Sequence, residues 1–280
     1  MIHKTIHCEK DGILRSLLTK EEIFNLQSIT ITGKVSNDDF SILTTMTKDY
    51  SLSVIDMSNA FAKKTNQIYF KFGFGQLREI RLPHNLEKIN YAAFSYSQIS
   101  YITIPSTVYE IGGEAFKNTE LEDIFIPASV RKIKQNAFAS TPLKKIEIAS
   151  KNIDIERGAF INCKNLSKIY LHKKTPPEIK IFENYPSIST FDSTLLQNCT
   201  VYVPKGSKET YEKADVWMKF KEFIEKDYEP ETEIIEKDYI LEFQKEKRKK
   251  KRFDNWEGCL VLLVLLGIAL LGLLLSSALS

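Results

Sequence analysis

Five stretches of the chain read LREIRLP, ISYITIP, LEDIFIP, LKKIEIA and LSKIYLH, beginning at Leu77, Ile99, Leu121, Leu143 and Leu166. Their starting positions advance by a nearly constant step of about 22 residues, so the sequence repeats itself. The apolar residues alternate as they do in a strand that buries one face. Ala-Phe pairs recur at the same spacing, with their phenylalanines at Phe94, Phe116, Phe138 and Phe160. This period predicts stacked copies of one structural unit.

A unit of this length leaves room for one short strand and a turn or short helix. No such unit can bury its apolar face alone, so we expect the units to stack as coils and their strands to pair into a continuous parallel sheet. The Phe of each pair is expected to fill the interior from the opposite wall. Similar apolar triplets begin at Leu26 and Leu52, at somewhat longer intervals, and predict irregular coils of the same stack.

The stretch ITIPSTVYEIGGEAF, residues 102–116, resembles the BspA-like leucine-rich repeats of bacterial surface proteins and their protozoan relatives. The shared pattern is I-x-I-P, then V-x-x-I-G, then A-F. TIHCEKDGILRSLL resembles the family's N-terminal cap, and residues 199–223 resemble its terminal capping segment. The resemblance implies an α+β, strand-dominated fold, a leucine-rich repeat solenoid of BspA-type coils with a parallel sheet. It implies no particular function.

We expect five segments along the chain. These are an N-terminal cap with irregular repeats (1–75), regular repeats (76–172), a C-terminal capping segment (173–228), a charged linker with a basic juxtamembrane block (229–257) and a transmembrane helix (258–278).

The predicted transmembrane helix lies in a stretch, residues 258–280, that carries no charge. At 1.5 Å per residue, 17 to 23 apolar residues extend about 26 to 34 Å, which matches a hydrocarbon core of about 30 Å. The basic side chains before it should remain in the cytoplasm, which predicts that the bulk of the chain is cytoplasmic. This block contains Lys247, Arg248, Lys249, Lys250, Lys251 and Arg252.

Residues 1–20 contain no apolar run of even five residues, so we expect no signal peptide and a tail-anchored protein. The alternative hypothesis is an exported, adhesion-type cell-surface protein whose true start lies upstream, because many relatives of this family are exported.

The charge is unevenly distributed along the chain. The net charge of the 280 residues is +3, but residues 245–257 alone carry seven basic and three acidic groups, so residues 1–244 sum to −1. Nucleic-acid binding requires a basic face, so the composition argues against it.

The motifs in the sequence predict no enzyme and no cofactor. The sequence has no nucleophile elbow, P-loop or zinc motif. His3 and His7 have a metal-ligand spacing but are interpreted as strand-edge residues, and His84 and His172 as residues of the rim. Cys163 shares a column with Ser97, Thr119 and Thr141, which predicts a small residue packed between coils. An enzyme with an unrecognised site is the third hypothesis.

The remaining candidate is the solvent face of the predicted sheet. Residues between the buried positions of each triplet should point outward and place aromatic rings, rimmed by charge, on one exposed surface. The alternative is a purely structural role, in which the aromatic residues are present because they favour strands and cover one another. We predict a non-catalytic membrane protein that binds a protein or peptide through Tyr101, Phe125, Tyr170, Tyr202 and Arg81.

Overall fold

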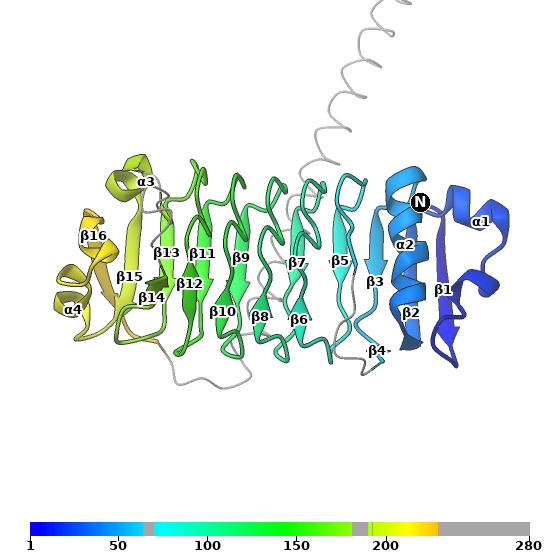
Figure 1. Ribbon diagram of the computed structural model, residues 1–280, viewed down its shortest axis with the longest axis horizontal. Helices are drawn as coiled ribbons and strands as arrows, with labels where there is room; N and C mark the ends of the chain where they lie inside the picture. The colour runs from blue at the N-terminus through cyan, green and yellow to red at the C-terminus, as the bar shows by residue number, and fades with distance from the viewer. Residues whose placement is uncertain (64–69, 181–189, 192, 229–280) are drawn as a thin grey trace, which may run out of the picture. The chain divides into compact units, whose positions relative to one another are not determined.

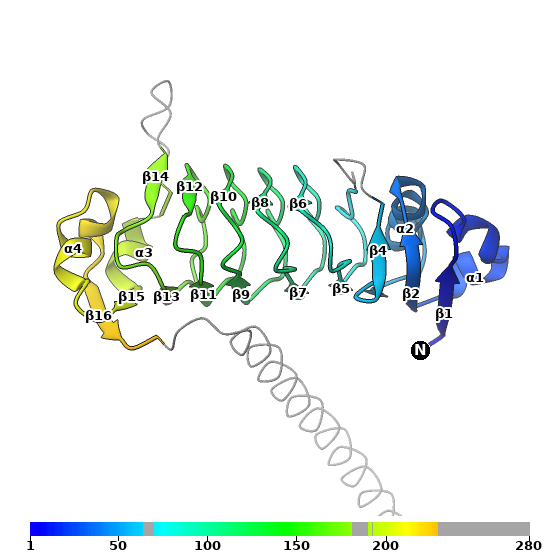
Figure 2. The same cartoon turned by 90° about the horizontal axis from the view of Figure 1, so that it is seen from below.

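The repeats fold into stacked coils, each of which adds one strand to a main sheet and most of which add one to a second sheet (Figures 1 and 2). The computed structural model describes residues 1–63, 70–180, 190–191 and 193–228, which belong to one compact unit, Met1–Glu229. Every strand pair is parallel, which confirms the predicted strand-dominated solenoid over these residues.

The main sheet runs along one side of the coils. Its strands are β1 (His3–Cys8), β2 (Ser28–Val35), β3 (Val54–Asp56), β5 (Glu79–Arg81), β7 (Tyr101–Thr103), β9 (Asp123–Ile126), β11 (Lys145–Ile148), β13 (Lys168–Leu171), β15 (Thr200–Pro204) and β16 (Glu222–Lys226).

The second sheet lies on the opposite side and has shorter strands (Figure 2). They are β6 (Lys88–Ile89), β8 (Glu110–Ile111), β10 (Lys132–Ile133), β12 (Asp154–Glu156) and β14 (Glu178–Lys180), and β4 (Ala60–Ala62) pairs with β2 instead. The helices are η1 (Leu14–Leu17), α1 (Lys20–Asn25), α2 (Asn37–Asp49), α3 (Ser193–Asn198), α4 (Lys208–Glu212) and η2 (Val216–Lys219). The coil that follows Leu26 is longer than the regular ones because it carries α2 in place of a short strand.

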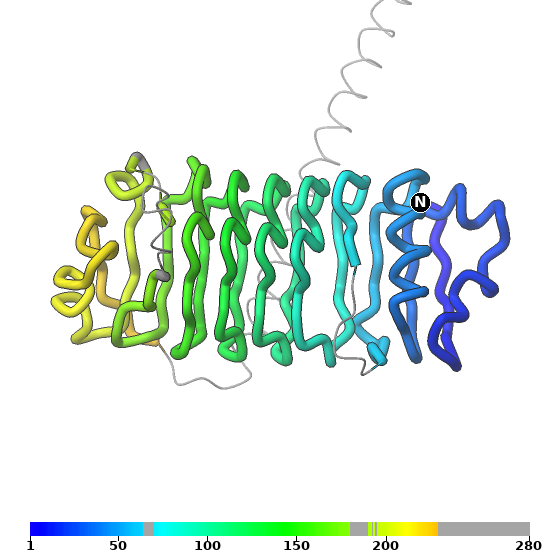
Figure 3. The backbone as a smooth tube through the Cα atoms, in the orientation of Figure 1, coloured from blue at the N-terminus to red at the C-terminus, as the bar shows by residue number. Residues whose placement is uncertain are grey.

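The main sheet is not the single continuous ladder expected from the sequence. It consists of a ladder from β1 to β7 and a second from β9 to β16, and no strand pairing joins β7 to β9. The two coils remain linked by a backbone bond from the Glu120 amide to the Ile99 carbonyl, at 3.0 Å. Tyr101 and Phe125, the bulkiest outward residues of β7 and β9, lie on either side of this break. The tube in Figure 3 follows the coils through it without a change of path.

The interior contains a column of phenylalanine rings, here called the phenylalanine spine. Successive rings are 5.1 to 5.9 Å apart and within 11° of parallel. All are buried, as predicted for the Phe of each Ala-Phe pair. The spine consists of Phe72, Phe94, Phe116, Phe138, Phe160 and Phe191.

Two caps close the ends of the stack. At the N-terminal end, the buried carboxylate of Asp39 accepts hydrogen bonds from the amides of Gly12 and Leu14, at 2.7 and 2.9 Å. At the C-terminal end, the ring of Phe191 meets Trp217 edge-on at 5.6 Å, and the Trp217 indole donates to the Pro177 carbonyl at 3.0 Å. Each cap therefore buries an end of the core that no further coil covers.

The predicted membrane span, residues 258–278, and the charged linker lie outside the described residues. Within the described part of the chain, no helix is long and apolar enough to cross a bilayer.

Candidate protein-binding face

The outward side chains of the main sheet form two rows, which we call the outer face. The strand register within each ladder, and the repeat period across the break, place the first row at Ser28, Val54, Glu79, Tyr101, Asp123, Lys145, Lys168, Thr200 and Glu222. The second row consists of Thr30, Asp56, Arg81, Thr103, Phe125, Glu147, Tyr170, Tyr202 and Ile224.

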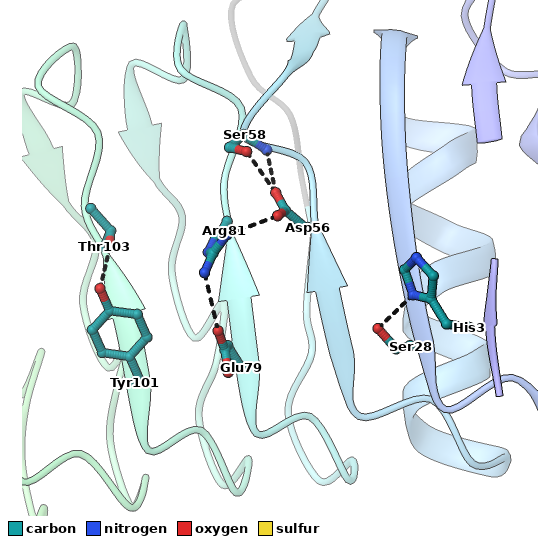
Figure 4. Close-up of polar contacts among 8 residues, drawn as sticks. All are labelled: His3, Ser28, Asp56, Ser58, Glu79, Arg81, Tyr101 and Thr103. Carbon is teal, nitrogen blue, oxygen red and sulfur yellow. Dashed lines mark hydrogen bonds and ion pairs between the residues drawn. The ribbon is translucent and has the colours of Figure 1, made fainter. Parts of the chain in front are cut away.

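In the N-terminal half of the outer face, the polar side chains contact one another (Figure 4). The guanidinium of Arg81 lies 3.0 Å from Asp56 and 3.8 Å from Glu79. The Asp56 carboxylate also accepts from the amide and the hydroxyl of Ser58, at 3.0 and 2.7 Å. Arg81 thus lies on the face as predicted, but its charge is largely engaged by its neighbours.

Tyr101 and Phe125 are buried, with 6 % and 8 % of their surface exposed, whereas the sequence predicted exposed aromatic residues. The hydroxyl of Tyr101 bonds to Thr103 Oγ1 at 2.9 Å, two residues along the same strand, so the ring lies along the sheet and does not stand out from it (Figure 4). Burial also raises the pKa of Tyr101. Parallel strands lie only about 4.8 Å apart, so large rings on one face cover one another. These two residues offer little surface to a partner.

The C-terminal half carries an exposed cluster of tyrosines and lysines. The rings of Tyr170 and Tyr202 stack at 4.3 Å with 7° between their planes, and both are partly exposed. The ammonium groups of Lys145 and Lys226 lie 5.1 and 5.0 Å from the centre of the Tyr170 ring, within cation–π distance. We call Tyr170, Tyr202, Lys145 and Lys226 the tyrosine cluster.

A partly buried carboxylate, Glu147, lies beside the tyrosine cluster in the same row of the outer face. The Glu147 carboxylate lies 3.0 Å from Nε2 of His172 and 3.2 Å from the ammonium of Lys145. Burial by itself would raise the pKa of Glu147, but the His172 hydrogen bond and the Lys145 charge outweigh it and lower that pKa. Glu147 therefore holds Lys145 beside the Tyr170 ring.

Tyr228 covers His172. Its ring centre lies 3.9 Å from that of His172, and its hydroxyl donates to the Tyr202 carbonyl at 3.2 Å. Burial raises the pKa of Tyr228, and the nearby Glu147 charge raises it further. His172 is consequently buried, at 7 % exposure, which corrects its interpretation as a rim residue.

Of the five residues predicted for this surface, the structure brings Tyr170 and Tyr202 together and separates them from Arg81. Sequence reasoning did not select Lys145, Lys226 or Tyr228 for it. The repeat columns already aligned Lys145 and Glu147 with the coil of Tyr170, but Lys226 and Tyr228 follow the last regular repeat, where the repeat period no longer assigns neighbours. The predicted juxtamembrane residues 247–252 lie outside the described residues.

His3, His7 and Cys163 have structural partners. His3 and His7 lie in β1 and bond to Ser28 and Thr32 of β2, at 3.0 and 2.9 Å. Cys163 is buried and its thiol donates to the Phe138 carbonyl at 3.1 Å, which confirms that it packs between coils. The described residues contain no group of three or more His, Cys, Asp and Glu side chains placed to hold a metal ion.

Comparison with known proteins identifies the repeats. Residues 63–190 match the BspA type leucine rich repeat region, in six copies. No curated protein sequence matches the chain. Among solved structures, the crystal structure of the pneumococcal vaccine antigen PcpA is similar, with 15 % sequence identity, 73 % of this chain and 80 % of that chain covered, and a TM-score of 0.22.

Proposed function

We propose that this chain, whose residues 63–190 are BspA-type leucine-rich repeats, is a non-catalytic protein that binds a protein partner through the tyrosine cluster. The observation that supports this is the stacked Tyr170–Tyr202 pair, partly exposed and flanked by two ammonium groups. Tyrosine supplies a large contact area at a small entropy cost, and tyrosines are common among the residues that dominate binding energy in interfaces.

The residues that contact the cluster favour the same function. Glu147, His172 and Tyr228 hold the lysines and rings in one arrangement before a partner arrives, so less conformational entropy is lost on binding. The outward lysines of this half of the face, Lys145, Lys168 and Lys226, are matched in number by Asp123, Glu147 and Glu222, so formal charge alone selects neither an acidic nor a basic partner.

The experiment compares affinity capture by the full chain with capture by two variants. The test variant carries Tyr170→Ala and Tyr202→Ala. The control carries Tyr109→Ala, which removes a tyrosine that is 37 % exposed and lies outside the main sheet. Quantitative mass spectrometry should find a protein retained by the native chain and the control but lost from the double variant by about tenfold or more. If the double variant captures the same proteins in the same amounts, the tyrosine cluster is not the binding surface.

We further propose that residues 258–278 anchor the protein in a membrane with the repeats in the cytoplasm. The uncharged stretch and the basic block before it support this orientation. Alkaline carbonate should leave the full chain in the membrane fraction, and a chain that carries two lysines near residue 267 should be released. Protease added to intact cells should leave the repeats uncut. Cleavage from outside would instead favour the exported, adhesion-type alternative.

A further inference from the structure

A groove crosses the second sheet, on the side of the coils opposite the outer face. It lies where this coil has two consecutive glycines, Gly112 and Gly113. Neighbouring coils carry residues with side chains at these two repeat positions. A Cβ atom on Gly112 would lie 2.5 Å from the carbonyl carbon of Asn90, so the backbone packing leaves no room for a side chain there. The gap is therefore a fixed part of the fold. Its volume is about 440 Å³, within the range of about 300 to 1,000 Å³ typical of small-molecule sites.

The charged groups that line the groove already have partners within the protein. The Glu110 carboxylate lies 3.1 Å from the ammonium of Lys134 and 3.8 Å from that of Lys88. The Glu156 carboxylate accepts a hydrogen bond from the backbone N–H of Gln135 at 3.0 Å. Two lysines and two glutamates line the groove, so their formal charges sum to zero. A charged ligand would have to compete with these internal pairs.

A neutral ligand with many hydroxyl groups meets no such competition. A carboxylate has about four acceptor sites and an ammonium three donors, so groups already in ion pairs can form further hydrogen bonds. Hydrogen bonds to charged partners are the stronger ones. The groove therefore offers closely spaced donors and acceptors without a net charge.

One wall of the groove also provides an apolar surface. The ring of Tyr91 is 54 % exposed, and a Cβ on Gly113 would lie 3.3 Å from its Cδ2 atom, so the ring stands directly beside the glycine gap. An exposed ring next to the gap can pack against the C–H face of a pyranose while the hydroxyl groups reach the charged side chains. We propose that this groove binds a neutral oligosaccharide. The site is independent of the tyrosine cluster, which lies on the other sheet.

Saccharide binding is tested with the full chain in an amine-oxide detergent, because glycosidic detergents would compete. Cellobiose, maltose, lactose and chitobiose are titrated separately and followed by calorimetry and saturation-transfer NMR. The test variant is Tyr91→Ala, and Tyr91→Phe keeps the ring. The matched control is Tyr96→Ala, which removes a ring that is 45 % exposed in the same turn but outside the groove. A hexapeptide of glutamate is the charged comparison probe.

At least one disaccharide should bind the native chain. Its affinity for the Tyr96→Ala control and for Tyr91→Phe should agree with the native value within about threefold. Its affinity for Tyr91→Ala should be about tenfold lower. The thermal unfolding temperature of each variant must match that of the native chain. If Tyr91→Ala does not fold, Glu110→Gln, which keeps the ring of Tyr91, replaces it as the test variant and should weaken binding. No binding of any disaccharide would overturn the proposal. Equal affinities of Tyr91→Ala and Tyr96→Ala would also overturn it, as would preferential binding of the glutamate peptide.

Discussion

Replacing Phe116 by alanine tests whether the phenylalanine spine holds the stack together. Phe116 is fully buried and stacks on Phe94 at 5.2 Å and on Phe138 at 5.1 Å, each with 10° between the planes. A buried Phe→Ala change typically costs about 3 to 5 kcal/mol, and an aromatic pair adds about 0.5 to 1.5 kcal/mol beyond its buried area. Because Phe116 has such a pair on both sides, we expect a loss at the upper end, about 5 kcal/mol.

The matched control is Phe74→Ala. Phe74 is 74 % exposed and has one stacking partner, Tyr96, at 4.8 Å, so its loss should cost less than about 1 kcal/mol. Urea denaturation of the full chain, followed by circular dichroism, measures both free energies of unfolding. If Phe116→Ala destabilises the protein no more than Phe74→Ala, the rings are not what couples one coil to the next. A domain of ordinary stability, about 5 to 15 kcal/mol, should remain folded in the control.

Three further predictions concern the pH dependence, the thiols and the groove. The pKa of Glu147 is lowered in the folded chain. The ionised Glu147 carboxylate therefore stabilises the fold above about pH 4.3, the pKa of an unfolded glutamate, and this stabilisation is lost as the pH falls through the pKa of Glu147 in the folded chain. Glu147→Gln should therefore unfold more easily at pH 7, by about 1 to 3 kcal/mol, and differ less from the native chain near pH 3, as measured by urea midpoints. Burial raises the pKa of Cys8 to about 11, with a contribution from the Asp39 charge, and burial raises that of Cys199 to about 12. N-ethylmaleimide should therefore modify these two thiols at neutral pH only after unfolding, which peptide mass mapping would detect. Rapid modification of either thiol in the folded chain would refute this. Gly112→Ala places a Cβ within 2.5 Å of the preceding coil's backbone and should lower stability by about 1 to 3 kcal/mol, whereas an unchanged melting temperature would show that the coils can shift apart.

The repeat period predicted most of the fold because it follows from a physical requirement of stacking. Each coil must present the same apolar positions to its neighbours, so Ile102, Ile124 and Phe116 are buried where the columns place them. The break between β7 and β9 was not predictable, since strand pairing depends on backbone geometry that a column of isoleucines does not encode.

The candidate site was predicted in part, because alternation along a strand gives the direction of a side chain but not its exposure. Tyr101 and Tyr170 are outward residues of the main sheet, yet the first is buried and the second is partly exposed. The difference depends on the neighbouring strands and, for Tyr101, on its hydrogen bond to Thr103. The cover over His172 comes from Tyr228, which lies beyond the period and is brought there by the C-terminal cap.

The uniform stacking of the spine makes the distance between the two caps adjustable in fixed steps. Each regular coil presents the same interior to both neighbours, so duplicating residues 99–120 would insert a coil that fits on either side. The insertion would move the caps apart by about 4.8 Å, one strand spacing, and leave the contacts within each cap unchanged. The number of repeats therefore determines the distance between the N-terminal cap and the tyrosine cluster.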